Sequence, residues 1–122
     1  MAVLQIGAGG VGWALAHKLA QNNDVIGDLV IASRTVAKCE TIIASIRRKG
    51  NIKDKSRSIT ARAHDADDVA ATVRLIREVR PDLVAYVGPP WTSVAVMEAC
   101  CQAGVSYLDT SVATDLCSPG QQ

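Results

Sequence analysis

A glycine-rich stretch near the start of the chain constrains its fold more than any other feature. Residues 3–12 read V-L-Q-I-G-A-G-G-V-G, in which an apolar run stops at Gly7 and an Ala- and Leu-rich segment begins within a few residues. Gly7, Gly9 and Gly12 fit the G-x-G-x-x-G pattern between a strand and a helix, the context in which that pattern is typical of dinucleotide binding. The stretch therefore predicts a first strand that ends in a phosphate-binding turn at the start of a helix.

The glycines of this stretch have different expected roles. Gly7 permits the tight turn out of the strand, Gly9 lets the backbone come close to a pyrophosphate, and Gly12 lets the helix pack closely on the sheet. Gly10 and Val11 lie at the start of the helix, whose unpaired N–H groups and positive dipole end would face the phosphates. All five residues are therefore candidates for cofactor binding.

The rest of the chain alternates between short apolar runs and segments of helical periodicity. Apolar runs predict strands at residues 3–6, 28–32, 83–87 and 105–108, and an alternating pattern predicts a weaker strand at residues 59–63. Helical spacing predicts helices at residues 11–21, 36–49 and 69–79, and a further helix between Thr92 or Ser93 and Gly104. This alternation indicates an α/β fold, a doubly wound parallel (Rossmann) sheet with strand order 3-2-1-4-5.

Apolar side chains at helical spacing predict the buried face of each helix. The expected stripes are Val11, Leu15 and Leu19 in the first helix and Val94, Met97 and Cys101 in the last. Thr35 is the expected N-cap of the helix that follows it, and Gly50 the expected end of that helix.

Length and composition bound the class of protein. A chain of 122 residues forms one domain, and 48% hydrophobic with 20% charged residues fits a soluble α/β protein with an aliphatic core, since Phe is absent. The sequence shows no apolar run of membrane-spanning length, no signal peptide and no C-x-x-C or metal-ligand pattern, so a cytoplasmic protein without a metal is expected. Residues 114–122 read as a helix start or linker, and because the sixth strand common in such sheets is missing, we expect a fragment of a longer enzyme.

The end of the second predicted strand discriminates between nucleotides. NAD-binding proteins place an acidic residue there, about 20 positions beyond the glycines, to bind the ribose hydroxyls. Here Ser33, Arg34 and Thr35 hold that place. Arg34 with flanking hydroxyls would bind a 2′-phosphate by charge-assisted hydrogen bonds or stack on the adenine, and Lys38 could reach the same phosphate. The sequence favours NADP(H) over NAD(H), with solvated surface side chains as the alternative for Arg34 and Lys38.

Other candidates follow later strands at the same edge of the sheet. Asp65 either contacts the adenine edge or caps the next helix. Gly88 and Pro89 either lie near the centre of the cofactor or terminate their strand. Trp13 is expected to pack in the fold, and neither His17 nor His64 has a partner that predicts a role.

Basic residues are concentrated in one region. Residues 34–62 contain nine basic and two acidic side chains, a net charge of +7, in a chain whose overall charge is +1. This region suits an anionic ligand, while a solvated loop without a partner is the alternative. A nucleic-acid contact is disfavoured because interleaved aromatic residues and a recognition motif are missing.

Several segments resemble a known family. They are residues 3–12, I-A-S-R-T at 31–35, V-G-P-P-W at 87–91, M-E-A-C at 97–100 and Y-L-D-T-S at 107–111. Over almost the whole chain, they resemble the saccharopine dehydrogenase-like family and, within it, the amino-terminal domains of the carboxynorspermidine (carboxyspermidine) dehydrogenases.

The resemblance implies a reductive condensation. A diamine, putrescine or 1,3-diaminopropane, would condense with aspartate β-semialdehyde, and NADPH would reduce the resulting imine in polyamine biosynthesis. Members carry a second, catalytic and dimerising domain, so residues 1–122 would be the NADP(H)-binding domain and inactive alone. By position, Asp109, Thr110 and Ser111 would lie near the nicotinamide, but no catalytic residue is named.

Three alternatives stay open. The parent protein could be a saccharopine-type dehydrogenase of amino-acid metabolism, or the chain could be a dinucleotide-sensing module without catalysis. A methyltransferase that uses S-adenosylmethionine also begins with a glycine-rich turn, but Ser33 and Arg34 stand where it normally has an acid. The sequence leaves the diamine and the formation of a homodimer open.

Overall fold

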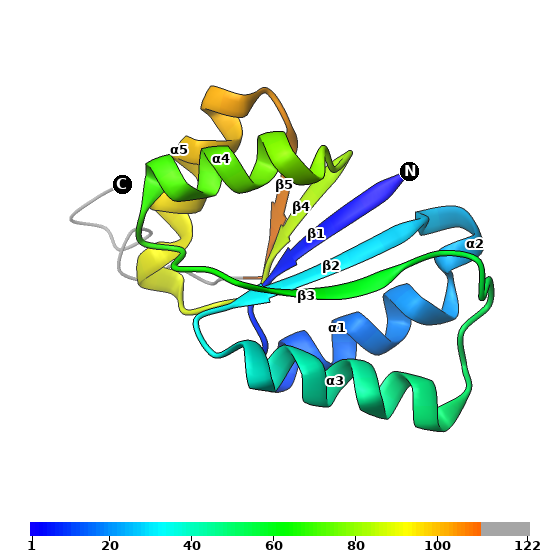
Figure 1. Cartoon of the computed structure of the whole chain (residues 1–122). Helices are drawn as coiled ribbons and strands as arrows, with labels where there is room; N and C mark the ends of the chain where they lie inside the picture. The colour runs from blue at the N-terminus through cyan, green and yellow to red at the C-terminus, as the bar shows by residue number, and fades with distance from the viewer. Residues whose placement is uncertain (111–122) are drawn as a thin grey trace.

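The computed structural model describes residues 1–110, which form a five-stranded parallel sheet with helices on both faces (Figure 1). The strands are β1 (Ala2–Ile6), β2 (Asp28–Ser33), β3 (Ile59–Ala63), β4 (Leu83–Tyr86) and β5 (Ser106–Asp109). Their order in the sheet is β3-β2-β1-β4-β5, which confirms the predicted topology. The bounds of β3 match the prediction, those of β1, β2 and β4 differ by one residue at one end, and β5 is shifted by one residue.

The helices are α1 (Gly10–Gln21), α2 (Asn23–Ile26), α3 (Val36–Lys49), α4 (Val69–Val79) and α5 (Ser93–Ala103), with a 3-10 turn η1 (Pro90–Thr92) before α5. Figure 1 shows α1 and α3 on one face of the sheet and α4 and α5 on the other. Gly50 ends α3 in the left-handed conformation, as predicted. Across residues 1–110, no helix has the length and apolar character needed to cross a membrane.

The short helix α2 was not predicted. It follows α1 directly, and the buried side chain of Asn23 anchors it. The Asn23 side-chain amide donates to the backbone carbonyl of Asp54 at 2.8 Å, and the backbone N–H of Asp54 donates to the Asn23 side-chain oxygen at 2.6 Å. These two hydrogen bonds hold the polar loop before β3 against α2, which directly precedes β2.

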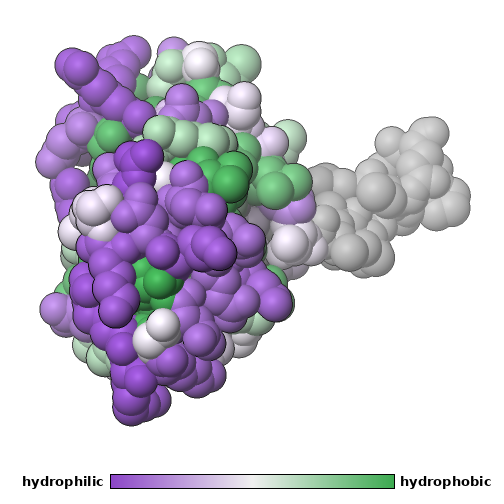
Figure 2. Space-filling model, turned by 90° about the vertical axis from the view of Figure 1, so that its right-hand side faces the viewer, coloured by the Kyte–Doolittle hydropathy of each residue, from purple (hydrophilic) through white to green (hydrophobic). Residues whose placement is uncertain are grey.

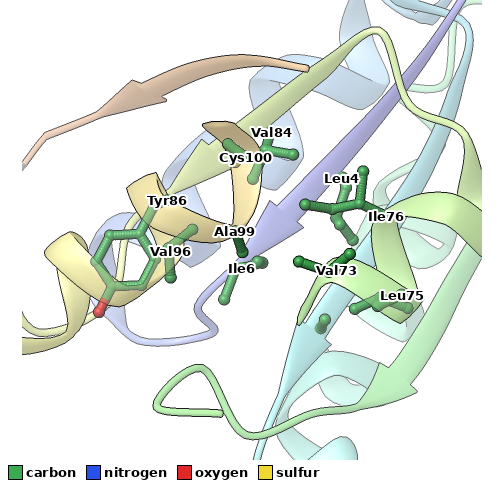
Figure 3. Packing of buried hydrophobic residues seen from close by; sticks show 11 residues of the cluster. Leu4, Ile6, Val73, Leu75, Ile76, Val84, Tyr86, Val96, Ala99 and Cys100 are labelled. Carbon is green, nitrogen blue, oxygen red and sulfur yellow. The ribbon is translucent and has the colours of Figure 1, made fainter. Parts of the chain in front are cut away.

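Successive residues of the strands fill two separate aliphatic layers. Leu4, Ile6, Val84 and Tyr86 point towards α4 and α5, where they meet residues such as Val73 (Figure 3). The layer on the other face lies under α1 and α3 and contains Val3, Leu29, Ile31, Ile42 and Ile46. Alternation of side chains along each strand therefore covers both faces of the sheet, as a parallel sheet requires.

The predicted buried face of α1 was right only in part. The fully buried positions are Gly12, Ala16 and Ala20, whereas Val11 is 55% exposed and the larger Leu15 and Leu19 are only partly buried. These small residues lie on the side of α1 that faces the sheet. At the start of the helix, Gly12 packs directly against the glycine-rich turn. The bulkier side chains flank these small residues.

The predicted buried face of α5 was wrong. Val96, Ala99 and Cys100 are buried, whereas Val94 is 58% and Met97 47% exposed. Cys101 is exposed as well. Small side chains again allow the helix to approach α4 and the sheet closely. The larger apolar side chains of Val94 and Met97 lie on its outer side.

Candidate functional site

The carboxyl ends of the strands meet at one edge of the sheet and form a pocket there. Ile6 pairs with Ala32 on one side and with Tyr86 on the other, and Ser33 pairs with Ala63, so the turns after β1, β2, β3 and β4 converge. They enclose a cavity of about 550 Å³. Its lining residues are Ile6, Gly7, Ala8, Gly9, Ser33, Arg34, Thr35, Lys38, His64, Ala66, Asp67, Tyr86, Val87, Gly88, Pro89, Trp91 and Thr92.

The glycine-rich turn supplies one wall of this pocket. Gly7 has a φ of +124°, and a Cβ on it would lie 2.8 Å from the Val87 carbonyl carbon. At Gly12 a Cβ would lie 2.6 Å from the Gly7 carbonyl oxygen, so this glycine lets α1 pack on the turn itself. A Cβ on Gly9 would have no atom of residues 1–110 within 4 Å. The turn is therefore closed towards the sheet and open towards the pocket.

The turn after β2 brings Arg34 to the pocket lining, and the first turn of α3 adds Lys38. Arg34 Nη2 lies 2.7 Å from Asp67 Oδ2 and 3.2 Å from Asp65 Oδ1. Both bonds use the same nitrogen, and within residues 1–110 the Nε and Nη1 groups of Arg34 form no hydrogen bond. The Arg34 side chain, 67% exposed, thus retains donors for a ligand.

The acidic partners of Arg34 come from the turn after β3. Asp65 Oδ1 accepts the backbone N–H of Asp67 at 3.0 Å, and this bond, with the nearby Arg34 guanidinium, lowers the pKa of Asp65. Asp65 does not cap α4; Asp68 does, accepting the N–H of Ala71 at 3.0 Å. The capping alternative for Asp65 was therefore wrong, and its actual role is to pair with Arg34.

The pocket is less positive than the sequence suggested. Arg34 and Lys38 are balanced by Asp65 and Asp67, which lie beside them. The last turn of α3, with three basic residues, lies about 20 Å away at the other end of this 14-residue helix. That end belongs to the amino edge of the sheet, whose surface is largely hydrophilic (Figure 2). Most of the basic cluster therefore lies outside the pocket.

The turn after β4 is shaped by Tyr86. Its hydroxyl donates to the Pro89 carbonyl, and burial, followed by the nearby carboxylates, raises the pKa of Tyr86 to about 12. A Cβ on Gly88 would lie 2.7 Å from that hydroxyl oxygen, so the Tyr86 ring itself requires glycine there. Gly88 and Pro89 both terminate β4 and line the pocket, while Trp91, 79% exposed, lies at the mouth.

His64 lines the pocket, although the sequence predicted no role for it. The Thr72 hydroxyl donates to the Asp68 carbonyl, so it can accept from His64 Nε2, which lies 2.8 Å away. Burial lowers the pKa of His64, partly offset by Asp65 and Asp68. A neutral imidazole protonated on Nε2 fits these contacts. Its position directly after β3 was the only signal in the sequence.

The remaining candidates, like Gly12 and Asp65, are not among the residues that line the pocket. Gly10 and Val11 are exposed in the first turn of α1. Asp109, at the end of β5, accepts the Tyr107 hydroxyl at 2.7 Å, and Thr110 follows it; Ser111 and residues 114–122 fall outside the described residues. Trp13 was expected to pack in the fold but is 36% exposed, and it stacks on His17 with ring centroids 5.1 Å apart.

Comparison with known proteins gives consistent matches. A family model described as the saccharopine dehydrogenase NADP binding domain matches residues 3–120. Carboxynorspermidine synthase of Vibrio alginolyticus is 67% identical over 122 residues, which is 100% of this chain and 30% of that protein. Carboxyaminopropylagmatine dehydrogenase of Synechocystis is 43% identical over 109 residues, 89% of this chain and 25% of that protein. The chain thus spans less than a third of the length of these curated relatives.

Solved structures share the fold. Apo saccharopine dehydrogenase (L-Glu forming) from Saccharomyces cerevisiae superposes with a TM-score of 0.68 at 18% identity, over 98% of this chain and 23% of that one. A UDP-glucose-4-epimerase from Stenotrophomonas maltophila, solved with bound NAD, gives a TM-score of 0.68 at 20% identity, over 93% of this chain and 38% of that one. At these identities the likeness concerns the fold alone.

Proposed function

Because this chain belongs to the saccharopine dehydrogenase NADP-binding domain family, we propose that the pocket at the carboxyl edge of its sheet binds NADP(H). The observation that carries the proposal is that two features line one pocket. The glycine turn is open at Gly9, and Arg34, directly after the neighbouring strand β2, has guanidinium N–H groups with no partner among residues 1–110. Gly9 and Arg34 are 25 positions apart in the sequence, and the fold brings both to one cavity.

The residues present fit the two phosphate groups of this cofactor. The pyrophosphate would lie against the first turn of α1, where N–H groups and the helix dipole favour an anion and where a side chain at Gly9 would intrude. The 2′-phosphate would pair with Arg34, supported by the Ser33 and Thr35 hydroxyls and Lys38. Asp65, whose contact with the adenine edge is a further proposal, would hold Arg34 from the other side.

We infer the chemistry of the parent protein from its relatives. NADPH supplies a hydride when bound, and the reaction proposed is reduction of an imine formed between a diamine and aspartate β-semialdehyde, a step of polyamine biosynthesis. The names carboxynorspermidine synthase and carboxyaminopropylagmatine dehydrogenase point to different amines, so these names do not specify the amine for this protein. Asp109 and Thr110 are proposed near the nicotinamide, and the enzyme is proposed to act in the cytoplasm.

Titration of the 122-residue chain with NADPH and NADH tests the cofactor proposal. We expect NADPH to bind more tightly. Arg34→Ala should weaken NADPH by about 1.5–3 kcal/mol, the range for hydrogen bonds to charged groups, and leave NADH nearly unchanged. Arg48→Ala is the matched control because it removes the same charge from the far end of α3. Equal losses for both cofactors would refute the 2′-phosphate site.

A test of the parent reaction needs the sequence downstream of Gln122. An in-frame continuation, expressed whole, should oxidise NADPH when given aspartate β-semialdehyde and either 1,3-diaminopropane or putrescine. A stop codon at that point, together with tight NADPH binding, would instead favour a dinucleotide sensor. Oxidation with an amino acid in place of the diamine would favour the saccharopine-type reaction.

A further inference from the structure

Gln5 is a buried polar residue in the middle of β1. Its side chain is 0% exposed, and its neighbours along the strand, Leu4 and Ile6, face the opposite layer of the core. Central strands of parallel sheets are normally apolar on both faces. A buried amide is unfavourable unless its polar atoms are hydrogen-bonded, so the partners of Gln5 explain why it stands there.

Both hydrogen bonds of the Gln5 amide go to the glycine-rich turn. Nε2 donates to the carbonyl of Gly7 at 3.0 Å and to the carbonyl of Gly12 at 2.9 Å. One side chain therefore ties the residue that leaves β1 to the residue in the first turn of α1. A Cβ on Gly12 would lie 3.2 Å from the same nitrogen, so the third glycine of the motif also makes room for this amide.

The carbonyl oxygen of the amide shows that apolar packing alone does not explain why glutamine stands at position 5. Its Oε1 atom is buried and has no hydrogen-bond partner within residues 1–110. Reversing the amide would place this oxygen against two carbonyl oxygens, so the orientation is fixed by the turn. An apolar side chain of similar size would avoid the unpaired acceptor but could not bind the two carbonyls.

Holding the Gly7 carbonyl inward also orients the next N–H group. In a trans peptide the carbonyl of one residue and the N–H of the following residue point in opposite directions. Because Gln5 holds the Gly7 oxygen towards the core, the N–H of Ala8 points away from it. Ala8 lines the pocket, and its N–H forms no backbone hydrogen bond within residues 1–110.

We propose that Gln5 is a positioning residue, whose two hydrogen bonds fix the glycine-rich turn so that its N–H groups meet the pyrophosphate. This inference rests on the proposed binding of NADP(H) and concerns only the pyrophosphate end of that site. Gln5 touches no part of the cofactor itself. It acts through the carbonyls of Gly7 and Gly12.

The test compares two ligands on the Gln5→Met variant of the 122-residue chain. Methionine keeps the length of the side chain and removes both donors. NADPH should bind about tenfold more weakly, the change expected when one or two neutral hydrogen bonds no longer restrain the turn. Adenosine 2′-monophosphate has the 2′-phosphate but no pyrophosphate, so its Kd should change less than about twofold. Equal weakening of both ligands, or of neither, would overturn the proposal.

Two controls separate positioning from loss of stability. Gln102→Met makes the same chemical change on the exposed face of α5 and should leave both affinities unchanged. Ile42→Val weakens the core under α3 without touching the turn. If it alters the NADPH to 2′-monophosphate ratio as Gln5→Met does, the positioning role is refuted.

A measurement on the unaltered chain covers the case in which Gln5→Met does not fold. NADPH should shift the NMR resonances of the Gln5 side-chain amide, whereas adenosine 2′-monophosphate should leave them in place. Absence of a shift with NADPH would overturn the proposal. A wild-type chain that binds neither ligand would refute the NADP(H) site itself, whereas normal binding without an effect of Gln5 would refute this inference alone.

Discussion

Replacing Asp67 by Asn should tighten NADPH binding, although it removes a polar contact from the proposed site. Asp67 Oδ2 lies 2.7 Å from Arg34 Nη2, and a 2′-phosphate would compete with it for the guanidinium. The side chains are 67% and 53% exposed, so this ion pair is worth about 0.5–1 kcal/mol. Relief of that competition corresponds to a roughly two- to fivefold lower Kd for NADPH.

The assay is calorimetric titration of the wild-type and Asp67→Asn chains with NADPH and NADH. NADH has no 2′-phosphate, so its affinity should not increase. Asp24→Asn changes the net charge equally but lies in α2, before β2, and should have no effect. Because exposed charges are screened by salt, the gain for NADPH should shrink as the ionic strength rises.

A double-mutant cycle decides whether Asp67 acts through Arg34. In an Arg34→Ala background, Asp67→Asn should lose most of its benefit, since the two side chains are in contact. The reasoning would be refuted if Asp67→Asn weakened NADPH binding, or if it tightened NADH and NADPH to the same extent.

Two further predictions concern the turn and the pocket wall. Gly9→Ala should change the free energy of unfolding by less than about 1 kcal/mol, because the added Cβ would have no described atom within 4 Å. The same change should weaken NADPH binding more than about tenfold, because the methyl group would lie where the pyrophosphate is proposed to bind. Gly12→Ala should instead destabilise the fold by about 1–3 kcal/mol, because its Cβ would lie 2.6 Å from the Gly7 carbonyl oxygen; similar thermal melts for both variants would contradict this. His64 has a lowered pKa, so the folded state favours its neutral form, and the free energy of unfolding should fall as the pH drops below 6.5. Denaturant melts at pH 8 and pH 5.5 should show a smaller fall for His64→Gln, and an equal fall would count against the assignment.

The sequence predicted the three inner strands well because β1, β2 and β4 are short, largely apolar runs whose residues are mostly buried. Residues 59–63 alternate between apolar and polar side chains and gave a weaker signal, and the strand order that right-handed crossovers favour is the one observed. The turn at Gly7 could also be predicted, because its positive φ is a local requirement that favours glycine.

The buried faces of α1 and α5 could not be predicted from apolar spacing. The rule that large apolar residues face the core fails where a helix approaches very closely. Ala16, Ala20, Ala99 and Cys100 are the residues that allow this approach. Their burial can be recognised only from the distance between helix and sheet, which is a property of the tertiary structure.

The partners of Arg34 and the role of Gln5 also depend on long-range geometry. Asp65 and Asp67 are separated from Arg34 by 31 and 33 residues, and the parallel register of β2 and β3 brings them together. From the sequence, Asp65 was expected only as an adenine contact or a helix cap and Asp67 was not considered, so the pairing of both carboxylates with Arg34 was missed. Gln5 reads as one polar residue in an apolar run until its contacts with Gly7 and Gly12 are seen.

A crystal structure of the chain with NADP⁺ would test the central claim most directly. The account predicts the pyrophosphate beside Gly9 at the start of α1, and the 2′-phosphate within hydrogen-bond distance of Arg34. A cofactor whose 2′-phosphate points away from Arg34, or whose pyrophosphate lies clear of the glycine turn, would contradict it.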